Sequence, residues 1–334
     1  MAELKGRVSL CVDDLEQMMG ALQLPAVVEA AERDFFRRAD EIAVDIAGQS
    51  RIRAVFISGP TASGKTTFTA RLVSKLTELG REAFCLSLDN YYDVRFPEFD
   101  EKGRPDYESL STLDLAHIAR DIRDLLAGQP VHLSEFDFGE TGLRSISDTQ
   151  YTLPPDAILL VEGLHGLATE ISGNVPRENR AGIFLLPWGG VVSDARLLES
   201  REIRLLRRIV RDVRHRSSGA LSTIDYWPMI VLSEQSCFSR YLKNADYYMN
   251  TMLPYESLVM APIALADIRS DLLAYREGRL PPSVFLRPHA TVDKDFADIK
   301  RALEYAETLA KNIAIIPAAD ATIVPARSIL NEFI

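Results

Sequence analysis

The chain has 334 residues, 47% hydrophobic and 26% charged, which is typical of a folded globular protein. Its net charge of −10 argues against a broad basic surface for nucleic acid. The three scattered cysteines fit a reducing compartment, and the five histidines lack the spacing of a zinc site. With neither an apolar signal core nor a membrane-length apolar run, we predict a cytoplasmic protein that binds neither membrane nor nucleic acid.

The first 50 residues are predicted to form an N-terminal helical extension. Residues 1–24 show only a weak pattern, whereas apolar side chains recur at spacings of three and four from Pro25 until Gly48. These side chains are Val28, Ala31, Phe35, Ala39, Ile42 and Ile46. We interpret the segment as a helix that packs on the outside of a sheet. A contact in a homo-oligomer is the alternative.

The stretch 54–67 contains a strand, a glycine-containing loop and the start of a helix. Residues 54–57 are an unbroken apolar run, as in a buried parallel strand. Residues 59–66 fit the pattern G-x-x-x-x-G-K-[ST], and apolar residues at helical spacing follow. Strand, loop and helix therefore occur in the order that a phosphate-binding P-loop requires.

The chemistry of a polyphosphate explains the residue types in this loop. Glycines let backbone N–H groups turn toward the phosphates, and the positive end of the helix dipole lies behind them. Lys65 is expected to reach the β- and γ-phosphates, and the Thr66 hydroxyl to bind Mg²⁺. We therefore predict ATP or GTP, with Mg²⁺, as the cofactors. The predicted nucleotide contacts are Gly59, Thr61, Ala62, Ser63, Gly64, Lys65, Thr66 and Thr67.

Two further strand candidates end in a carboxylate. Residues 83–88 lead into Asp89, and residues 157–161 lead into Glu162. Ligands of α/β sheets bind beyond the carboxyl ends of the strands, so both residues are candidates for the site. We predict that Glu162 holds Mg²⁺ or its water, and that Asp89 is a general base or a water-mediated magnesium contact. An Asx turn or a helix N-cap is the structural alternative for Asp89.

Residues 93–150 are predicted to form an excursion on the substrate side. A polar stretch, 93–109, has the length usually found in substrate or lid loops. A helix and an alternating segment up to Phe138 follow. A short hairpin outside the main sheet is compatible with this pattern, and so is a substrate role for Asp137 and Arg144. His165 is interpreted as structural.

The segment 200–220 contains the most unusual composition of the chain. Seven arginines between residues 201 and 216 accompany an apolar face, which predicts a helix with an arginine-rich side. Three interpretations compete: a solvated face, a nucleic-acid contact, and the leading helix of a lid that closes over ATP. The lid interpretation assigns phosphate contacts to the arginines. The arginines are Arg201, Arg204, Arg207, Arg208, Arg211, Arg214 and Arg216.

The remaining elements complete a single domain. Residues 183–186 and 245–250 are predicted strands, and a helix near the C-terminus precedes the tail within 290–334. No repeat or low-complexity linker divides the chain. We predict one P-loop domain over residues 51–334: a three-layer α/β fold with a mainly parallel sheet, the excursion and an arginine-bearing lid.

Together these motifs resemble the phosphoribulokinase/uridine kinase family of P-loop kinases, and most of all its bacterial uridine kinase-like nucleoside kinases. The resemblance covers about residues 28–334. The resembling segments are 59–67, 87–92, 136–138, 161–163, 204–212, 227–228, 244–246 and the tail 324–334.

The resemblance implies roles for particular residues. Asp89 resembles the carboxylate that takes the proton from the acceptor hydroxyl. Tyr91 and Tyr92 lie where the family has an aromatic residue near the acceptor. The segment that contacts the nucleoside is expected to be Phe136, Asp137 and Phe138, and the lid arginines to be Arg208, Arg211 and Arg216.

Some positions depart from the family pattern. Glu202-Ile203-Arg204 replaces the frequent Asp-Thr-Arg, and Ser217 replaces a glycine. The nucleoside-contacting histidine of uridine kinases has no clear counterpart after Phe138.

We predict a small-molecule kinase that transfers the γ-phosphoryl group of ATP or GTP to a hydroxyl of a nucleoside like uridine or cytidine. Lys65, Arg208 and Arg211 are expected to stabilise the charge, and Asp89 to act on the acceptor. One alternative acceptor is a sugar, polyol or sugar phosphate. A second alternative is a regulatory module that binds nucleotide without catalysis.

Overall fold

The computed structural model describes residues 6–93, 97–136, 144–286 and 294–334. A five-stranded parallel sheet has the strand order β10-β7-β2-β6-β3. Its strands are β2 (Ala54–Ser58), β3 (Ala83–Ser87), β6 (Ile158–Glu162), β7 (Arg180–Leu186) and β10 (Tyr247–Asn250). The predicted strands therefore form one sheet.

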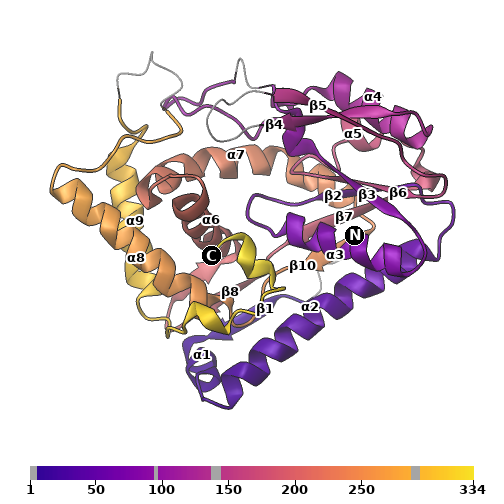
Figure 1. The fold of residues 1–334 in the computed structure, drawn as a ribbon. Helices are drawn as coiled ribbons and strands as arrows, with labels where there is room; N and C mark the ends of the chain where they lie inside the picture. Colours follow the sequence, from indigo (N-terminus) through magenta and orange to yellow (C-terminus); the bar gives the residue numbers. More distant parts are fainter. Residues whose placement is uncertain (1–5, 94–96, 137–143, 287–293) are drawn as a thin grey trace.

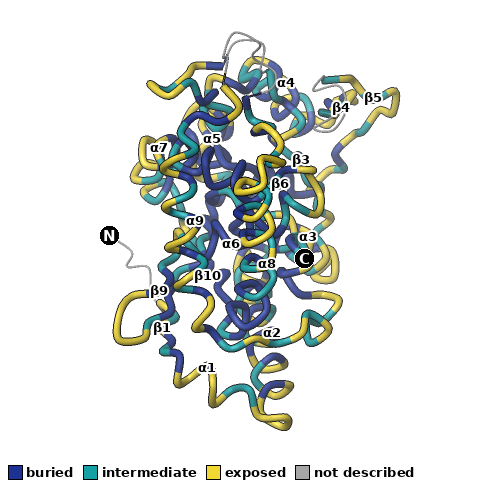
Figure 2. The backbone as a smooth tube through the Cα atoms, turned by 90° about the vertical axis from the view of Figure 1, so that its left-hand side faces the viewer, coloured by how far each residue is buried: buried dark blue, intermediate teal, exposed yellow. Residues whose placement is uncertain are grey.

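Alternate residues of the central strands contribute to two separate cores. Val55 and Ile57 of β2 lie in the larger core, whereas Ala54 and Phe56 lie in the smaller one. Successive side chains of a strand point to opposite faces, so both faces of the sheet are covered. Figure 2 shows the buried residues running through the middle of the molecule. The chain therefore has the predicted three-layer α/β architecture.

Helices cover the two faces. On the face of the larger core, α2 (Gln23–Ala47) packs beside α3 (Lys65–Glu78), and Phe35 of α2 is fully buried. The other face is covered mainly by α4 (Leu115–Leu126) and the short α5 (Thr169–Ser172). No helix in the described ranges combines the length and apolarity that crossing a bilayer requires.

Two smaller sheets lie outside the central one. The hairpin of β4 (Val131–Phe136) and β5 (Arg144–Tyr151) confirms the structural alternative for this part of the excursion. The strand β1 (Val8–Cys11) pairs in parallel with β8 (Gly189–Val192), which pairs with β9 (Arg196–Glu199). The helix α1 (Val12–Met18) follows β1. The N-terminal extension thus contains a strand as well as helices, and this strand joins it to the chain after β7.

Four helices gather beside the sheet (Figure 1): α6 (Ser200–His215), α7 (Ala220–Asn244), α8 (Glu256–Arg276) and α9 (Ile299–Ile313). The helix α6 contacts both α7 and α8. The helix α7 contains Pro228 in its interior. Pro228 lacks the N–H of a helical hydrogen bond, and its buried neighbours Trp227 and Met229 favour the continuous helix.

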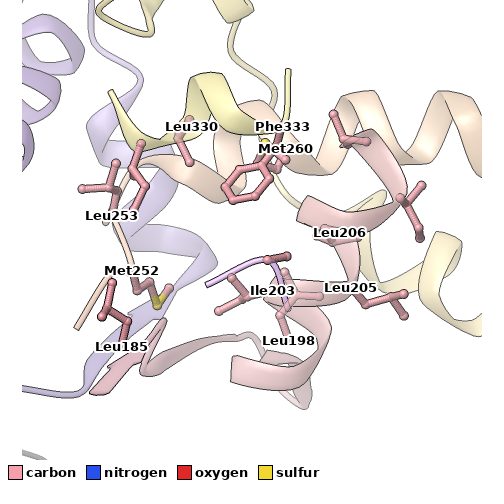
Figure 3. Close-up of a cluster of buried hydrophobic side chains, with 14 of the residues drawn as sticks. Leu185, Leu198, Ile203, Leu205, Leu206, Met252, Leu253, Met260, Leu330 and Phe333 are labelled. Atoms are coloured by element: carbon pink, nitrogen blue, oxygen red, sulfur yellow. The ribbon is translucent and has the colours of Figure 1, made fainter. Parts of the chain in front are cut away.

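The C-terminal tail packs into the larger core. In Figure 3, Leu330 and Phe333 of the tail lie in a cluster with Met260 and Leu253. Ile329 is the first residue of the short 3-10 turn Ile329–Glu332, and its side chain lies against Gly64 of the P-loop. A Cβ added to that glycine would come within 2.0 Å of Ile329 Cδ1. The tail therefore reaches the loop between β2 and α3.

His165 joins three segments after β6. Its Nδ1 lies 2.6 Å from the Tyr241 hydroxyl of α7, and its Nε2 lies 2.8 Å from the Glu108 carbonyl of the excursion. Burial lowers the pKa of this imidazole to about 4, and the Glu108 carbonyl opposes that shift. The neutral ring holds the excursion against α7, which fits the structural interpretation of His165.

His165→Gln should reduce the acid sensitivity of folding. The unfolded chain binds a proton near the ordinary histidine pKa, whereas the folded protein binds it only near pH 4, so acid favours unfolding between these values. We expect the loss of stability from about pH 7 to pH 5, measured by urea unfolding, to be about 2 kcal/mol smaller in the variant. His132→Gln, at an exposed histidine, is the control. Equal pH dependence in the wild type and His165→Gln would contradict the assignment.

Candidate active site

The P-loop connects β2 to α3 through two glycines that admit no side chain. Gly64 has a φ of 84°, in the left-handed region that favours glycine. A Cβ on Gly59 would lie 2.5 Å from the Leu185 carbonyl oxygen. Lys65 folds back over the loop, and its Nζ donates to the carbonyls of Gly59 (3.1 Å) and Pro60 (3.2 Å). The loop thus has the shape that a polyphosphate requires, with its lysine beside it.

The two strand-end carboxylates lie at the same edge of the sheet as the P-loop. Glu162 is opposite Ile57 of β2 and Ser87 of β3, and the Ser87 hydroxyl donates to its Oε1 at 2.7 Å. Burial raises the pKa of Glu162 to about 7, and the charge of Asp89 adds to the rise. The two acidic groups therefore lie near each other, as the strand pattern predicted.

Asp89 lies in the short 3-10 turn Leu88–Tyr91 that follows β3. Its side chain reaches solvent, yet the surrounding protein displaces enough water to raise the pKa of its carboxyl. The positive charges of Lys65 and Arg216 oppose that rise. This arrangement places a carboxylate of raised pKa beside the P-loop lysine, where a general base for an acceptor hydroxyl is needed.

The oxygen groups at this edge fit a hard cation. In the described part of the chain, no three His, Cys, Asp or Glu side chains form a ready metal cluster. Mg²⁺ is usually held by one or two carboxylates together with phosphate oxygens, so such a cluster is not required. The Thr66 hydroxyl and the Glu162 carboxylate are the groups that would hold the ion, with Asp89 nearby. Its chemistry there would be to neutralise charge on the phosphates.

The excursion adds two carboxylates that the sequence interpretation missed. Glu108 Oε1 accepts from Arg208 at 3.2 Å, and its charge contributes to the raised pKa of Asp89. Burial raises the pKa of Asp106 to about 6. The segment 93–109 was predicted to be a polar substrate or lid loop, but nothing local in it shows which residues turn inward.

Tyr91 and Tyr92 have opposite environments. Tyr91 is fully buried, and its hydroxyl donates to Asp121 Oδ2 of α4 at 2.7 Å. This placement corrects the expectation that Tyr91 lies near the acceptor, because the 3-10 turn directs the ring into the smaller core. The pKa of Tyr92 is raised well above its usual value by burial and by the charges of Asp89 and Glu108, so this ring lies near those two carboxylates.

The other predicted substrate contacts are less direct. The ring of Phe136 lies 5.7 Å from that of Tyr92, so the two aromatics border the same region. Arg144 pairs with Asp114, the N-cap of α4, at 2.9 Å, which gives it a structural partner. The predictions for Asp137 and Phe138 fall outside the described residues.

Three predicted lid arginines gather around one buried carboxylate, Asp212. Arg208 Nε and Arg211 Nε each donate to it at 3.1 Å, and Arg216 Nε lies 3.8 Å away. Burial favours the neutral acid, but the charges of Arg208 and Arg211 outweigh it and lower the pKa of Asp212. The positive charges of Arg211 and Arg216 also act to lower the pKa of Asp89, so both arginines lie close enough to influence the proposed base.

The structure corrects the interpretation of the arginine-rich side of α6 as a solvated face. Arg204, Arg207 and Arg208 are almost fully buried. The guanidinium of Arg208 donates to the Thr61 hydroxyl of the P-loop at 2.9 Å and lies beside the stacked rings of Tyr226 and Phe285. The partners of these arginines come from distant parts of the chain, so the pattern within the helix did not reveal burial.

The C-terminal tail supplies a further contact that the sequence did not predict. The carboxylate of Glu332 accepts a hydrogen bond from the backbone N–H of Thr67 in the first turn of α3. An anion at a helix N-terminus is favourable, and this end of α3 is where the P-loop is expected to receive phosphate. Glu332 therefore occupies a donor that a nucleotide would use.

Comparisons with known proteins agree with this geometry. A family model described as "Phosphoribulokinase / Uridine kinase family" matches residues 54–254. The uridine-cytidine kinase C of Dictyostelium discoideum is 31% identical over 170 residues, which are 51% of this chain but only 32% of that protein. A uridine kinase of Macrococcus caseolyticus is 24% identical over 206 residues, 61% of this chain and 89% of that one.

Among solved structures, a putative fructose transport system kinase from Silicibacter sp. TM1040 matches with a TM-score of 0.42 and 13% identity, over 63% of this chain and 98% of that one. The family model covers more than half of the residues and includes the P-loop, both strand-end carboxylates and α6. The chain therefore belongs to the phosphoribulokinase/uridine kinase family.

Proposed function

We propose that this protein is a cytoplasmic kinase that transfers the γ-phosphoryl group of ATP, or of GTP, to a hydroxyl of a small molecule. The observation that carries the proposal is a complete P-loop that shares one sheet edge with Asp89 and Glu162. The names of the relatives, uridine kinase and uridine-cytidine kinase, support phosphoryl transfer and favour a nucleoside as the acceptor.

In the proposed reaction, the protein orients the two substrates and balances charge. Lys65 leaves the carbonyls of its own loop for the β- and γ-phosphates. Asp89 accepts the proton of the acceptor hydroxyl, and its raised pKa makes it a stronger base than an ordinary aspartate. Arg211 and Arg216, whose charges act on Asp89, stabilise the negative charge on the transferring group.

The residues around Asp89 favour a nucleoside over a simple sugar. Tyr92 lies near Asp89 and Glu108, and the ring of Phe136 lies 5.7 Å from that of Tyr92. Aromatic rings suit the planar base, whereas carboxylates suit the hydroxyls of a ribose. A sugar, polyol or sugar phosphate would use only the second set of groups, and this acceptor class is the alternative.

The experiment that tests the function is a coupled ADP-release assay with Mg-ATP and a panel of acceptors. The panel contains uridine, cytidine, other nucleosides, ribulose 5-phosphate, sugars and polyols, and Lys65→Ala is the control. We expect ADP release that depends on a nucleoside and disappears in the control. A response only to sugars or polyols would replace the nucleoside assignment. If no acceptor gives ADP release although ATP binding is confirmed, the regulatory alternative would be favoured over catalysis.

Asp89→Asn should separate chemistry from nucleotide binding. The amide cannot accept the acceptor proton, and general-base catalysis contributes roughly 10²- to 10⁴-fold, so we expect kcat to fall within that range. ATP affinity, measured by calorimetry, should change less than about threefold. Asp148→Asn, at an exposed position of β5, is the control. Near-normal turnover of Asp89→Asn would refute the assignment of the base.

Glu332→Gln should tighten nucleotide binding. The wild-type carboxylate occupies the Thr67 N–H and brings a negative charge to the phosphate end of α3, whereas a glutamine side chain is uncharged and a weaker acceptor. We expect the Kd of Mg-ATP to fall about two- to tenfold, as for other charges at helix termini. Glu307→Gln, at an exposed position of α9, serves as the control. Unchanged or weaker binding would show that Glu332 does not oppose the nucleotide.

A further inference from the structure

Two buried ion pairs between α6 and its neighbouring helices have no place in the proposed reaction. Arg204 pairs with Glu234 of α7, and Arg207 pairs with Glu256 of α8. Both pairs touch the backbone of the P-loop. We propose that Arg204 and Glu234 are positioning residues that hold the P-loop in its phosphate-binding shape before the nucleotide arrives. The inference rests on the proposed function in one respect: the P-loop must bind a nucleotide.

The Arg204–Glu234 pair satisfies both backbone polar groups of one loop residue. Its two hydrogen bonds are parallel, each 2.7 Å long, and the two side chains are only 6% and 3% exposed. Arg204 Nη1 also donates to the Thr61 carbonyl, and Glu234 Oε1 accepts from the Thr61 N–H, each at 3.2 Å. Thr61 is therefore held on both sides of its Cα by a single ion pair.

The second pair holds the next residue of the loop. Arg207 donates to both carboxylate oxygens of Glu256, at 3.0 and 2.7 Å, and its Nη1 donates to the Ala62 carbonyl at 3.2 Å. Its Nη2 donates to the carbonyl of Thr251, just after β10. The guanidinium thus ties Ala62 to the edge strand of the central sheet.

The loop needs such support because Ala62 has an unfavourable backbone. Its φ of 57° lies in the left-handed region, which costs a non-glycine residue free energy and persists only where the surroundings impose it. Ala62 and the neighbouring Ser63 precede Gly64, whose own left-handed φ of 84° leads into α3. If the backbone of Thr61 and Ala62 relaxed, the N–H groups of the following loop residues would no longer point together toward the phosphates.

Fold stability alone gives a poor reason for these pairs. Removing two charges from water costs about as much as their attraction returns, and an apolar pair of the same size often stabilises a protein equally well. Arg204 and Glu234 are also poorly placed to bind phosphate themselves, because both Nη groups of Arg204 and both carboxylate oxygens of Glu234 are already engaged with each other or with Thr61. A positioning role accounts for both their burial and their contacts.

The test compares Arg204→Lys with a matched variant, Arg104→Lys. Lysine keeps the charge of Arg204 but lacks the fork that reaches Glu234 and the Thr61 carbonyl together. Arg104 is similarly buried and pairs with Asp225 of α7, the helix that also carries Glu234, and within the described residues it makes no hydrogen bond or ion pair with the P-loop. Mg-ATP binding is measured by calorimetry, and hydrogen exchange by mass spectrometry of the nucleotide-free protein over the peptide 54–68.

We expect Arg204→Lys to weaken Mg-ATP binding about tenfold and to speed exchange in the loop peptide, with the KM of the acceptor unchanged at saturating ATP. Arg104→Lys should lose comparable thermal stability and show neither effect. Wild-type affinity and exchange in a folded Arg204→Lys would overturn the positioning role.

A second variant covers the case in which Arg204→Lys does not fold. Glu234→Gln keeps an oxygen for the Thr61 N–H but loses the ion pair, and we expect binding to weaken about threefold with faster loop exchange. Unchanged binding and exchange would again overturn the role. If the wild type itself does not bind Mg-ATP, both the proposed function and the positioning role are wrong. If the wild type binds Mg-ATP and the variants behave like it, only the positioning role is wrong.

Discussion

The P-loop backbone must present its amides to a polyphosphate while its other side faces the protein interior, and this constraint organises the larger core. Buried backbone groups need hydrogen-bond partners. On the outward side, the proposed nucleotide would be that partner. On the inward side, Arg204 and Glu234 serve Thr61, and Arg207 serves Ala62. The close packing of α6 between α7 and α8 follows, because the arginines come from α6 and their glutamates come from the other two helices.

The negative charges beside the P-loop are a second constraint, because an acidic protein would have to bind an anionic ligand there. Asp89 and Glu162 lie beside the phosphate-binding loop, and the loss of surrounding water raises the pKa of both carboxyls. The charge of Glu108 adds to the rise at Asp89, and the charge of Asp89 adds to the rise at Glu162. Lys65, Arg211 and Arg216 offset part of this charge. A cation held by Thr66 and Glu162 would offset more, and it would favour the ionised form of the carboxylates. Metal, nucleotide and ionised carboxylates would therefore stabilise one another at this site.

Sequence reasoning succeeded where structure follows from local pattern. The strand, loop and helix around Lys65 depend on adjacent residues, and the carboxylates after β3 and β6 follow from the rule that parallel strands end at one edge. It failed where a partner lies far away. Arg204 and Arg207 were assigned to a solvated face, a nucleic-acid contact or a phosphate-binding lid, and their ion pairs were missed because Glu234 and Glu256 belong to other helices. Tyr91 was wrongly expected near the acceptor, because one turn of 3-10 helix decides whether its ring points toward the site or into the smaller core.

The tail shows how such distant contacts connect the site to the rest of the fold. Phe333 lies under the guanidinium of Arg207, at 5.2 Å from ring centroid to Cζ, while Ile329 covers Gly64. Both side chains are buried, whereas Glu332 between them is partly exposed. A nucleotide that takes the Thr67 N–H must displace the carboxylate of Glu332. Because Glu332 is partly exposed, rotation of its side chain would free the Thr67 N–H and leave the apolar contacts of Ile329 and Phe333 in place.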